Sequence, residues 1–387
     1  MAAQLSIQYR PKAKRQRSAP KFAEFFAGIG LMRLGLEAAG WNIAWANDID
    51  ETKYELYDAH FGDASEHFVL DDVHNVDASS IPDVDLATAS FPCTDLSLAG
   101  GRKGIHAGES SAFWGFVDAI ASMNTRPPLV LLENVTGFLS SNGGRDFEQA
   151  MRALNDIGYA VDPFILNARW FVPQSRPRLF VVGRLGVKGD ESCKFAESRI
   201  RPASIVKYIQ SHPVITWSIA DLPDPPSESQ YQLSDILDDL PNTASEWWED
   251  DRVEYLFNQM SERHRKQVAP LIRKRKYSYG TVFRRVRMQA NGSKRSMAEV
   301  RLDGIAGCLR TPKGGSGRQI LIRAGHGKLR ARLLTPSECA RLMGADDFEI
   351  SGSLNEALFG FGDAVCASAV KWIADNALTT IGNNRND

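Results

Sequence analysis

The sequence has few cysteines, no long apolar run and almost no net charge. Its five cysteines in 387 residues form no C-x-x-C pair and are an odd number, which argues against a disulfide framework and a zinc ribbon. No run approaches the roughly 18 apolar residues of a membrane helix, and the N-terminus lacks the apolar segment of a signal peptide. These absences predict a soluble, reduced, cytoplasmic protein that has no membrane partner and no bound metal.

The net charge of −1 is the sum of oppositely charged stretches. Residues 252–332 hold 21 basic and 4 acidic side chains, whereas residues 22–251 hold 16 basic and 35 acidic ones. Residues 1–21 add six basic side chains and no acid, and we interpret them as a mobile basic arm. An excess of basic residues on this scale favours contact with a polyanion such as nucleic acid over a merely solvated face.

From residue 22 onward, strand-like apolar runs alternate with helix-like stretches. The alternation predicts an α/β fold whose mostly parallel sheet carries helices on both faces and binds its ligand beyond the carboxyl ends of the strands. After Gly183 the pattern gives way to irregular sequence. We therefore expect these units: the basic arm 1–21, a catalytic cofactor-binding domain 22–183, a smaller irregular domain 184–331, and a C-terminal segment 332–387 that returns to the first domain.

A cofactor site is indicated where the first strand ends. Gly28 and Gly30 follow that strand and precede a helix, but the third glycine of the dinucleotide fingerprint is replaced by Arg33. Asp48 and Asp72 follow the next two strands and could bind ribose hydroxyls and an adenine amino group. A ribose site without a pyrophosphate site suggests an adenosine cofactor such as S-adenosylmethionine, although either aspartate could instead cap a helix.

Candidate reactive groups follow the later strands. Cys93 ends a strand and precedes a glycine-rich loop, as a nucleophile would, whereas the other four cysteines are predicted to be small buried side chains. Glu133 ends the next strand and could donate a proton if burial raises its pKa. Arg176 and Arg178 alternate along a strand, which suits binding of a phosphate or a pyrimidine oxygen, or else an ion pair with strand-end carboxylates.

Together these blocks resemble the DNA (cytosine-5) methyltransferase family of bacterial restriction-modification systems. The blocks appear in the family order: FAGIG at 26–30, acidic strand ends at Asp48 and Asp72, FPC at 91–93, ENV at 133–135, Q-x-R-x-R at 174–178, RLLTPSECARLMG at 332–344 and GDAV at 362–365. A block taken singly is unspecific, but seven in order are strong support for the resemblance.

The resemblance implies a fold of the S-adenosylmethionine-dependent, Rossmann-like type and a reaction at a flipped cytosine. Cys93 would add to ring carbon 6, Glu133 would hydrogen-bond or protonate ring nitrogen 3, and Arg178, supported by Arg176, would hold the ring oxygen or a nearby phosphate. The S-adenosyl-L-methionine that donates the methyl group, leaving as S-adenosyl-L-homocysteine, would be bound by Phe26, Ala27, Gly28, Ile29, Gly30, Asp48, Ile49, Asp72, Val73, Pro92, Asp363, Ala364 and Val365.

By the same resemblance, residues 184–331 would be the target recognition domain and double-stranded DNA the partner. Contacts to DNA are expected from Ser97 and from the basic residues Arg273, Lys274, Arg275, Lys276, Arg284, Arg285 and Arg287. Glu338 and Arg341 would organise the interface between the domains rather than take part in chemistry. The family further implies a monomer near the bacterial nucleoid, with a possible companion restriction endonuclease for the same DNA site.

Three positions depart from the family pattern and bear on cofactor affinity. Leu31 replaces a glycine, Ile49 stands where a tryptophan commonly covers the adenine, and Asp363 replaces an asparagine and adds a negative charge near the cofactor's carboxylate. Two alternative functions stay open at this point: a tRNA cytosine-5 methyltransferase of the same family, and a non-catalytic module that binds cofactor and DNA. Residues 224–227, which read DPPS, resemble the motif of amino methyltransferases but lack its aromatic residue, and we interpret them as a linker.

Overall fold

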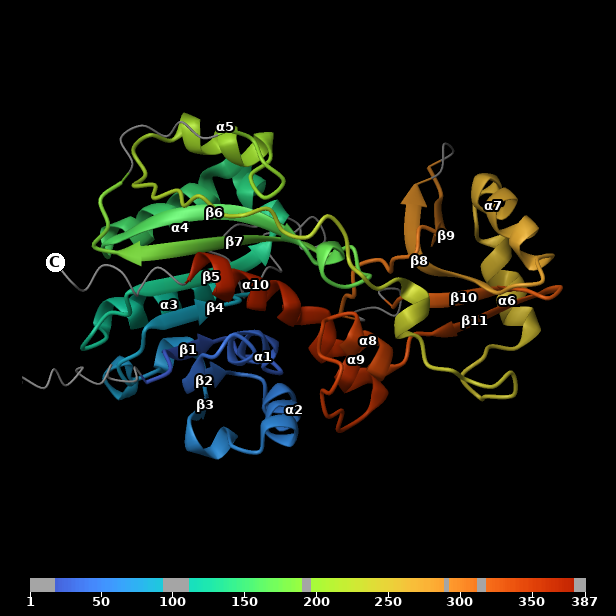
Figure 1. Ribbon diagram of the computed structural model, residues 1–387, viewed down its shortest axis with the longest axis horizontal. Coiled ribbons are helices and arrows are strands. Elements are labelled where there is room, and N and C mark those ends of the chain that lie inside the picture. Colours follow the sequence, from blue (N-terminus) through green and yellow to red (C-terminus); the bar gives the residue numbers. More distant parts are fainter. Residues whose placement is uncertain (1–17, 93–110, 190–195, 289–291, 312–317, 379–387) are drawn as a thin grey trace, which may run out of the picture.

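The computed structural model describes residues 18–92, 111–189, 196–288, 292–311 and 318–378, and they form two lobes (Figure 1). The larger lobe is built on a seven-stranded sheet with the strand order β3-β2-β1-β4-β5-β7-β6. The strands are β1 (Lys21–Phe25), β2 (Asn42–Asp48), β3 (Phe68–Leu70), β4 (Leu86–Ala89), β5 (Leu129–Val135), β6 (Tyr159–Asn167) and β7 (Pro177–Leu185). All neighbours are parallel except β7, which is antiparallel to both β5 and β6, so the predicted mostly parallel sheet is confirmed.

Helices cover both faces of this sheet because its strands carry apolar side chains on both sides. Ala23 and Phe25 of β1 pack in one core with α3 (Ala112–Ser122), α4 (Arg145–Asp156) and α5 (Ala203–Ser211). Phe22, one residue along, packs in a second core on the opposite face with α1 (Leu31–Glu37) and α10 (Ala367–Ala377). The last helix, α10, thus lies against the first, α1, in the large lobe.

The smaller lobe is built on an antiparallel sheet with the strand order β11-β10-β8-β9 (Figure 1). Val253, Leu256 and Val268, from two helices, pack against one face of it. The strands are β8 (Ser278–Met288), β9 (Lys294–Arg301), β10 (Ile320–Gly325) and β11 (Lys328–Leu333), and the helices are α6 (Asp250–Asn258) and α7 (Glu262–Ile272). The four strands carry ten of the 21 basic side chains of residues 252–332.

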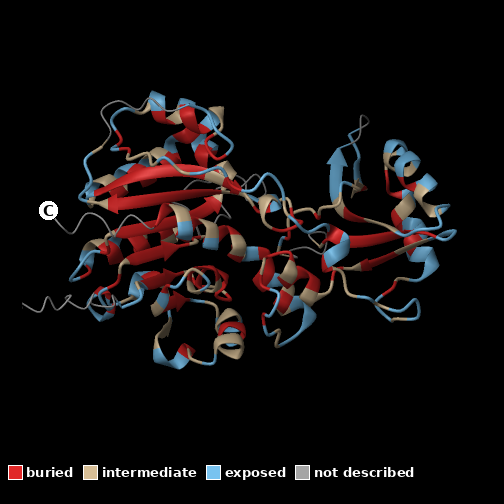
Figure 2. Ribbon diagram, in the orientation of Figure 1, coloured by how far each residue is buried: buried red, intermediate tan, exposed pale blue. Residues whose placement is uncertain are grey.

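A third apolar core joins the two lobes. It combines Ile29 and Leu56 of the large lobe with Leu321 of β10 and with residues of α8 (Pro336–Arg341) and α9 (Leu354–Asp363). Figure 2 shows buried segments on both sides of this junction, among intermediate and exposed ones. The lobes are therefore held together by packing and not only by the chain that connects them.

Polar side chains reinforce the same junction. Glu338, which is fully buried, accepts hydrogen bonds from Arg332 (2.7 Å) and from the backbone N–H groups of Thr335 and Asp238 (2.9 Å each). Arg341 forms an ion pair with Asp238 at 2.7 Å. Glu338 and Arg341 thus organise the junction, in the manner expected from the sequence.

Two features differ from the sequence-based expectations. Ile205, Ile209 and Trp217 belong to the core of the large sheet, so the large lobe continues well beyond the boundary expected at residue 184. Among the residues that the structure describes, one stretch, Leu354–Ala377, is also apolar and long enough to cross a membrane by composition alone. That stretch is split into α9 and α10, and both helices pack in protein cores.

Candidate active site

The loop between β1 and α1 has the geometry of a ligand cradle. Phe26, Gly28 and Gly30 all adopt left-handed backbone conformations, with φ of 57°, 57° and 82°. A Cβ atom at Gly30 would lie 2.4 Å from the ring of Phe61, so only glycine fits there. At Gly28 the same atom would meet nothing within 4 Å, which leaves open space beside the backbone. Ala27 and Ile29 are buried and anchor the loop.

Asp48 holds this loop from the end of β2. Its carboxylate is only 7% exposed and accepts hydrogen bonds from the backbone N–H groups of Gly28 (2.8 Å) and Asp50 (3.0 Å). Asp48 is therefore not the cap of the following helix, α2 (Glu51–Phe61), because Asp50 caps that helix. The next residue, Ile49, exposes 67% of its surface although it is apolar. An exposed apolar side chain beside a fixed carboxylate suits the base and ribose of a nucleoside.

Asp72 and Val73 mark the end of β3. Asp72 caps a short 3₁₀ helix by accepting hydrogen bonds from the backbone N–H of His74 (2.9 Å), and it lies 2.7 Å from His74 Nδ1. These bonds from His74 lower the pKa of the Asp72 carboxyl. Val73 is buried below it. Of the two aspartates that could have been helix caps, Asp72 is one and Asp48 is not.

The segment containing Asp363, Ala364 and Val365 ends α9 and lies beside the same loop. A Cβ atom at Gly360 would lie 2.7 Å from the side chain of Ile29, so α9 packs directly against the glycine loop. Asp363 is exposed and forms an ion pair with Lys53 of α2 at 3.3 Å. The extra negative charge noted in the sequence therefore has a counter-ion.

The FPC and ENV blocks are tied to each other. Asn134, at the end of β5, is buried and donates a side-chain hydrogen bond to the carbonyl of Phe91 at 3.1 Å. Pro92 follows Phe91, whereas Cys93 and Ser97 lie outside the described residues. The hydrogen bond fixes the chain two residues before Cys93 against the strand that carries Glu133.

Glu133 and Arg178 form a buried ion pair. Arg178 Nε lies 3.0 Å from Glu133 Oε1, and Glu133 is only 6% exposed. The antiparallel direction of β7 explains the contact, because it places Arg178, near the start of β7, opposite Val135 at the carboxyl end of β5. Burial raises the pKa of the Glu133 carboxyl, and the positive charges of Arg178 and Arg176 oppose the rise.

Arg176 is fully buried and joins three segments of the chain. Its guanidinium donates hydrogen bonds to the carbonyls of Leu309 (2.8 Å), Gly362 (3.0 Å) and Ala364 (2.5 Å). Its partner in the Q-x-R motif, Gln174, accepts from the backbone N–H of Leu309 at 2.9 Å. Arg176 therefore holds both lobes at the edge of the site, while Arg178 supplies the charge beside Glu133.

Cys308 differs from the buried, inert cysteine that we expected at its position. It is half-buried and lies 3.3 Å from a guanidinium nitrogen of Arg176. Burial disfavours its thiolate, but the positive charges of Arg176, Arg178 and Arg310 outweigh burial and lower the pKa of the thiol. The expectation holds for Cys339 and Cys366, which are buried, and Cys193 lies outside the described residues.

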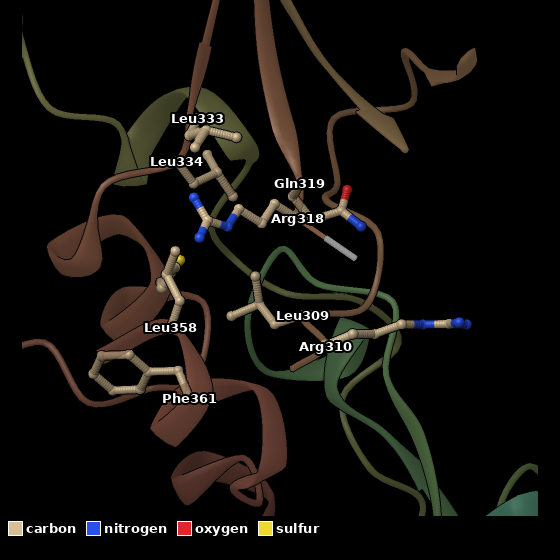
Figure 3. A pocket seen from close by; sticks show the side chains of 9 residues that line it. Leu309, Arg310, Arg318, Gln319, Leu333, Leu334, Leu358 and Phe361 are labelled. Carbon is tan, nitrogen blue, oxygen red and sulfur yellow. The ribbon is translucent and has the colours of Figure 1, made fainter. Parts of the chain in front are cut away.

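A cleft of about 680 Å³ lies between the two lobes. Ser175 and Pro177, which flank Arg176, line one side, and Arg285 and Arg287 of β8 line the other. A second, small cavity of about 20 Å³ lies deeper in the junction, between Leu309, Leu334 and Phe361. Figure 3 shows Arg318 reaching toward this small cavity while Arg310 extends in another direction. The volume of the small cavity suits a single water molecule, whereas the large cleft is wide enough for a substrate.

The basic residues that we expected to contact DNA fall in three places. Arg285 and Arg287 face the cleft, and Arg284 lies on the opposite face of β8, 5.7 Å from the ring of Trp248. The remaining four, Arg273, Lys274, Arg275 and Lys276, are exposed after α7, where the turn between β10 and β11 hydrogen-bonds to the carbonyl of Lys274.

A family model for C-5 cytosine-specific DNA methylases matches residues 20–379. The chain belongs to this family. The type II methyltransferase M.HhaI of Haemophilus parahaemolyticus is 26% identical over 364 residues, which cover 94% of this chain and 95% of that protein. The type II methyltransferase M.DsaV of Dactylococcopsis salina is 28% identical over 363 residues, covering 93% and 86%.

The fold of this family member agrees with solved structures. The Entamoeba histolytica methyltransferase EhMeth aligns with a TM-score of 0.62 at 15% identity, covering 93% of this chain and 98% of that one.

Sequence reasoning alone did not find Lys53, Gln174 or Glu299 as residues of the site or the cleft. Gln174 is the first residue of the Q-x-R-x-R motif, so the motif itself could have indicated a role for it.

Proposed function

We propose that this methylase transfers a methyl group from S-adenosyl-L-methionine to carbon 5 of a flipped cytosine in a short, specific sequence of duplex DNA. The supporting observation is the buried Glu133–Arg178 pair, which lies beside the Phe91–Asn134 hydrogen bond at the carboxyl edge of the sheet. Pro177, the residue before Arg178, lines the cleft between the lobes. In a family defined by cytosine-5 chemistry, a nucleophile, a proton donor and a cation are the groups that this reaction requires.

The chain's own groups suit each step. The Cys93 thiolate forms a bond to ring carbon 6 and pushes electron density onto the ring. Glu133, whose pKa burial raises, carries the proton that hydrogen-bonds ring nitrogen 3, and Arg178 stabilises the ring oxygen. When bound, the donor's sulfonium supplies the methyl group to carbon 5. Water then takes the carbon-5 proton, the electron pair of that bond re-forms the double bond between carbons 5 and 6, and the bond from Cys93 Sγ to carbon 6 breaks to release the thiolate.

The residues around the glycine loop fit this donor. The open space beside Gly28 leaves room for the methionine part of the donor. Asp48, already held by backbone N–H groups, presents a carboxylate to the ribose hydroxyls. Ile49 and Phe26 would take the two faces of the adenine, and Val73 and Pro92 would close the pocket's edge. No group of three or more His, Cys, Asp or Glu side chains suited to a metal occurs among the described residues, and the proposed chemistry uses none.

Duplex DNA is the proposed substrate rather than tRNA because the family model and both relatives named above are DNA methylases or type II methyltransferases. The second lobe, with its basic strands, is the proposed target recognition domain. As in a restriction-modification pair, a companion endonuclease would cleave the same site when it is unmethylated. The protein would act as a monomer on DNA in the cytoplasm.

A duplex that carries 5-fluorocytosine at target sites tests the mechanism. Fluorine at carbon 5 cannot leave as a proton does, so the wild-type protein with donor should form a denaturation-resistant adduct, and Cys93→Ala should form none. A wild type that methylates ordinary duplex but forms no adduct, or a Cys93→Ala protein that still methylates, would refute the mechanism. Methyl transfer to tRNA but not to duplex DNA would refute the substrate, and donor binding without any transfer would favour a non-catalytic module.

A further inference from the structure

Strands β8 and β9 extend beyond the rest of the smaller sheet. β10 pairs with β8 over residues 278–282, whereas β9 pairs with β8 over residues 281–288. Residues 283–288 and 294–299 therefore form a two-stranded antiparallel ribbon beyond the reach of β10. Figure 1 shows this part of β8 projecting away from β10 and β11, and Figure 2 shows its end as exposed.

The two faces of the ribbon have different surroundings, because successive side chains of a strand point to opposite sides. Phe283, Arg285 and Arg287 line the cleft of about 680 Å³ that also reaches Ser175 and Pro177 beside the active site. Arg284, between them, points to the other face and lies over Trp248. Arg285 and Arg287 thus lie on the cleft face of the ribbon, and Arg284, which carries the same charge, lies on the other face.

An acidic side chain joins the arginines on the cleft face. Glu299 of β9 lies opposite Phe283 and forms ion pairs with Arg287, whose Nε donates at 2.9 Å, and with Arg285 at 3.6 Å. All three side chains are partly exposed, so they are accessible to a partner in the cleft. The Glu299 carboxylate lowers the net positive charge that this face presents to phosphates, and it fixes the orientation of both guanidinium groups across the ribbon.

The width of the ribbon and the mixed charge of its face suit the edges of base pairs. The major groove of B-DNA admits a two-stranded ribbon, arginine pairs bidentately with guanine O6 and N7, and glutamate accepts a hydrogen bond from the cytosine amino group. We propose that the cleft face of the β8–β9 ribbon reads DNA sequence, with Arg285, Arg287 and Glu299 recognising G·C base pairs of the target site in addition to the methylated cytosine. This inference rests on the proposed function, because it assumes that duplex DNA enters the cleft.

The test compares base preferences, not overall activity. The wild-type site is first mapped by bisulfite sequencing of a methylated plasmid, and each base pair of that site is then changed in turn in short duplexes. Affinity for every duplex is measured by fluorescence anisotropy in the presence of S-adenosyl-L-homocysteine. Arg285→Ala and Arg287→Ala should each lose about 10- to 100-fold of discrimination at a G·C pair, and Glu299→Gln should relax preference at the same positions.

Arg284→Ala is the matched control, since it removes the same charge from the adjacent residue on the other face. It should weaken binding to all duplexes by a similar factor, without altering the ranking of the base changes. Arg285→Lys keeps the charge but not the bidentate geometry, so it should relax discrimination while it preserves the salt dependence of binding. Circular dichroism and S-adenosyl-L-homocysteine affinity verify that each variant is folded.

Two failures are distinguishable. A wild type that binds the cofactor product but methylates no plasmid would overturn the proposed function. A wild type with a mapped site, combined with Arg285, Arg287 and Glu299 variants that all keep the wild-type ranking of base changes, would overturn only the inference about the ribbon. A mapped site without any G·C pair other than that of the methylated cytosine would overturn it as well.

Discussion

Replacing Arg176 by methionine should destabilise the protein strongly although the site chemistry is assigned to other residues. Methionine keeps part of the apolar stem but leaves the carbonyls of Leu309, Gly362 and Ala364 without the guanidinium that now donates to them. A buried acceptor that loses its partner costs about 1–3 kcal/mol. Three such acceptors give an expected loss of about 3–9 kcal/mol in the free energy of unfolding.

That loss is a large part of the 5–15 kcal/mol typical of a folded domain. Arg176→Lys gives a graded comparison, because a single ammonium group cannot span carbonyls on both sides of the arginine. We expect it to lose about 1–3 kcal/mol, which corresponds to one unpaired acceptor. Because Arg176 contacts both lobes, the lobes should separate, and the protein should unfold, at a lower urea concentration than in wild type.

Urea unfolding followed by tryptophan fluorescence measures the effect, since Trp217 is buried in the core of the large lobe and Trp247 in the core that joins the lobes. Arg145→Met is the matched control: Arg145 is exposed and donates to the carbonyl of Asn142 at 3.2 Å, so its replacement should change stability by less than about 0.5 kcal/mol. An Arg176→Met protein whose stability lies within about 1 kcal/mol of wild type would refute the reasoning, because the three carbonyls would then not depend on the guanidinium.

Three further results follow from charges at the large lobe. Burial raises the pKa of Glu24 to about 8, so the native state keeps its proton at pH values where the unfolded state has released it. The free energy of unfolding of the wild type should therefore fall as the pH rises from about 5 to 8. Urea titrations of Glu24→Gln should show no such fall, because glutamine does not titrate. Arg178→Leu removes the charge that opposes the raised pKa of Glu133, so the carboxyl should titrate at still higher pH by NMR, and a fall would contradict the ion pair. Lys53→Met should weaken binding of S-adenosyl-L-homocysteine in calorimetry, and Asp363→Asn in the same chain should restore it; equal loss in the double variant would show that the pair does not matter.

The sequence predicted the large sheet well because its pattern is local. The strand, glycine turn and helix around Gly28 and Gly30 are specified by neighbouring residues, and burial of both sheet faces leaves apolar runs that are easy to recognise. The pattern is weaker at β6, which contains Pro163; the proline is tolerated there because β6 lies at the edge of the sheet. The boundary at residue 184 was wrong because α5 returns to the large core after an irregular stretch.

The roles of residues in the site were less predictable where their partners are distant in sequence. Glu133 and Arg178 were both identified, but their contact depends on the reversed direction of β7, which no local pattern indicates. The partners of Arg176 lie at 309, 362 and 364, so its linking role could not be read from the motif. The β8–β9 ribbon was also invisible, because its exposed end alternates charged residues with exposed Val286 and so lacks a buried face.

The apolar core between the lobes has a thermodynamic consequence. Ile29 belongs to the glycine loop that we assign to the methyl donor, yet it packs in the same core as Leu321 of β10, in the lobe that we assign to DNA. A ligand that changes the packing of Ile29 therefore acts on a core that both lobes share, and linkage requires any resulting coupling to be reciprocal. Whatever factor S-adenosyl-L-homocysteine contributes to duplex affinity, the duplex must contribute the same factor to S-adenosyl-L-homocysteine affinity, and paired titrations in both orders measure that coupling.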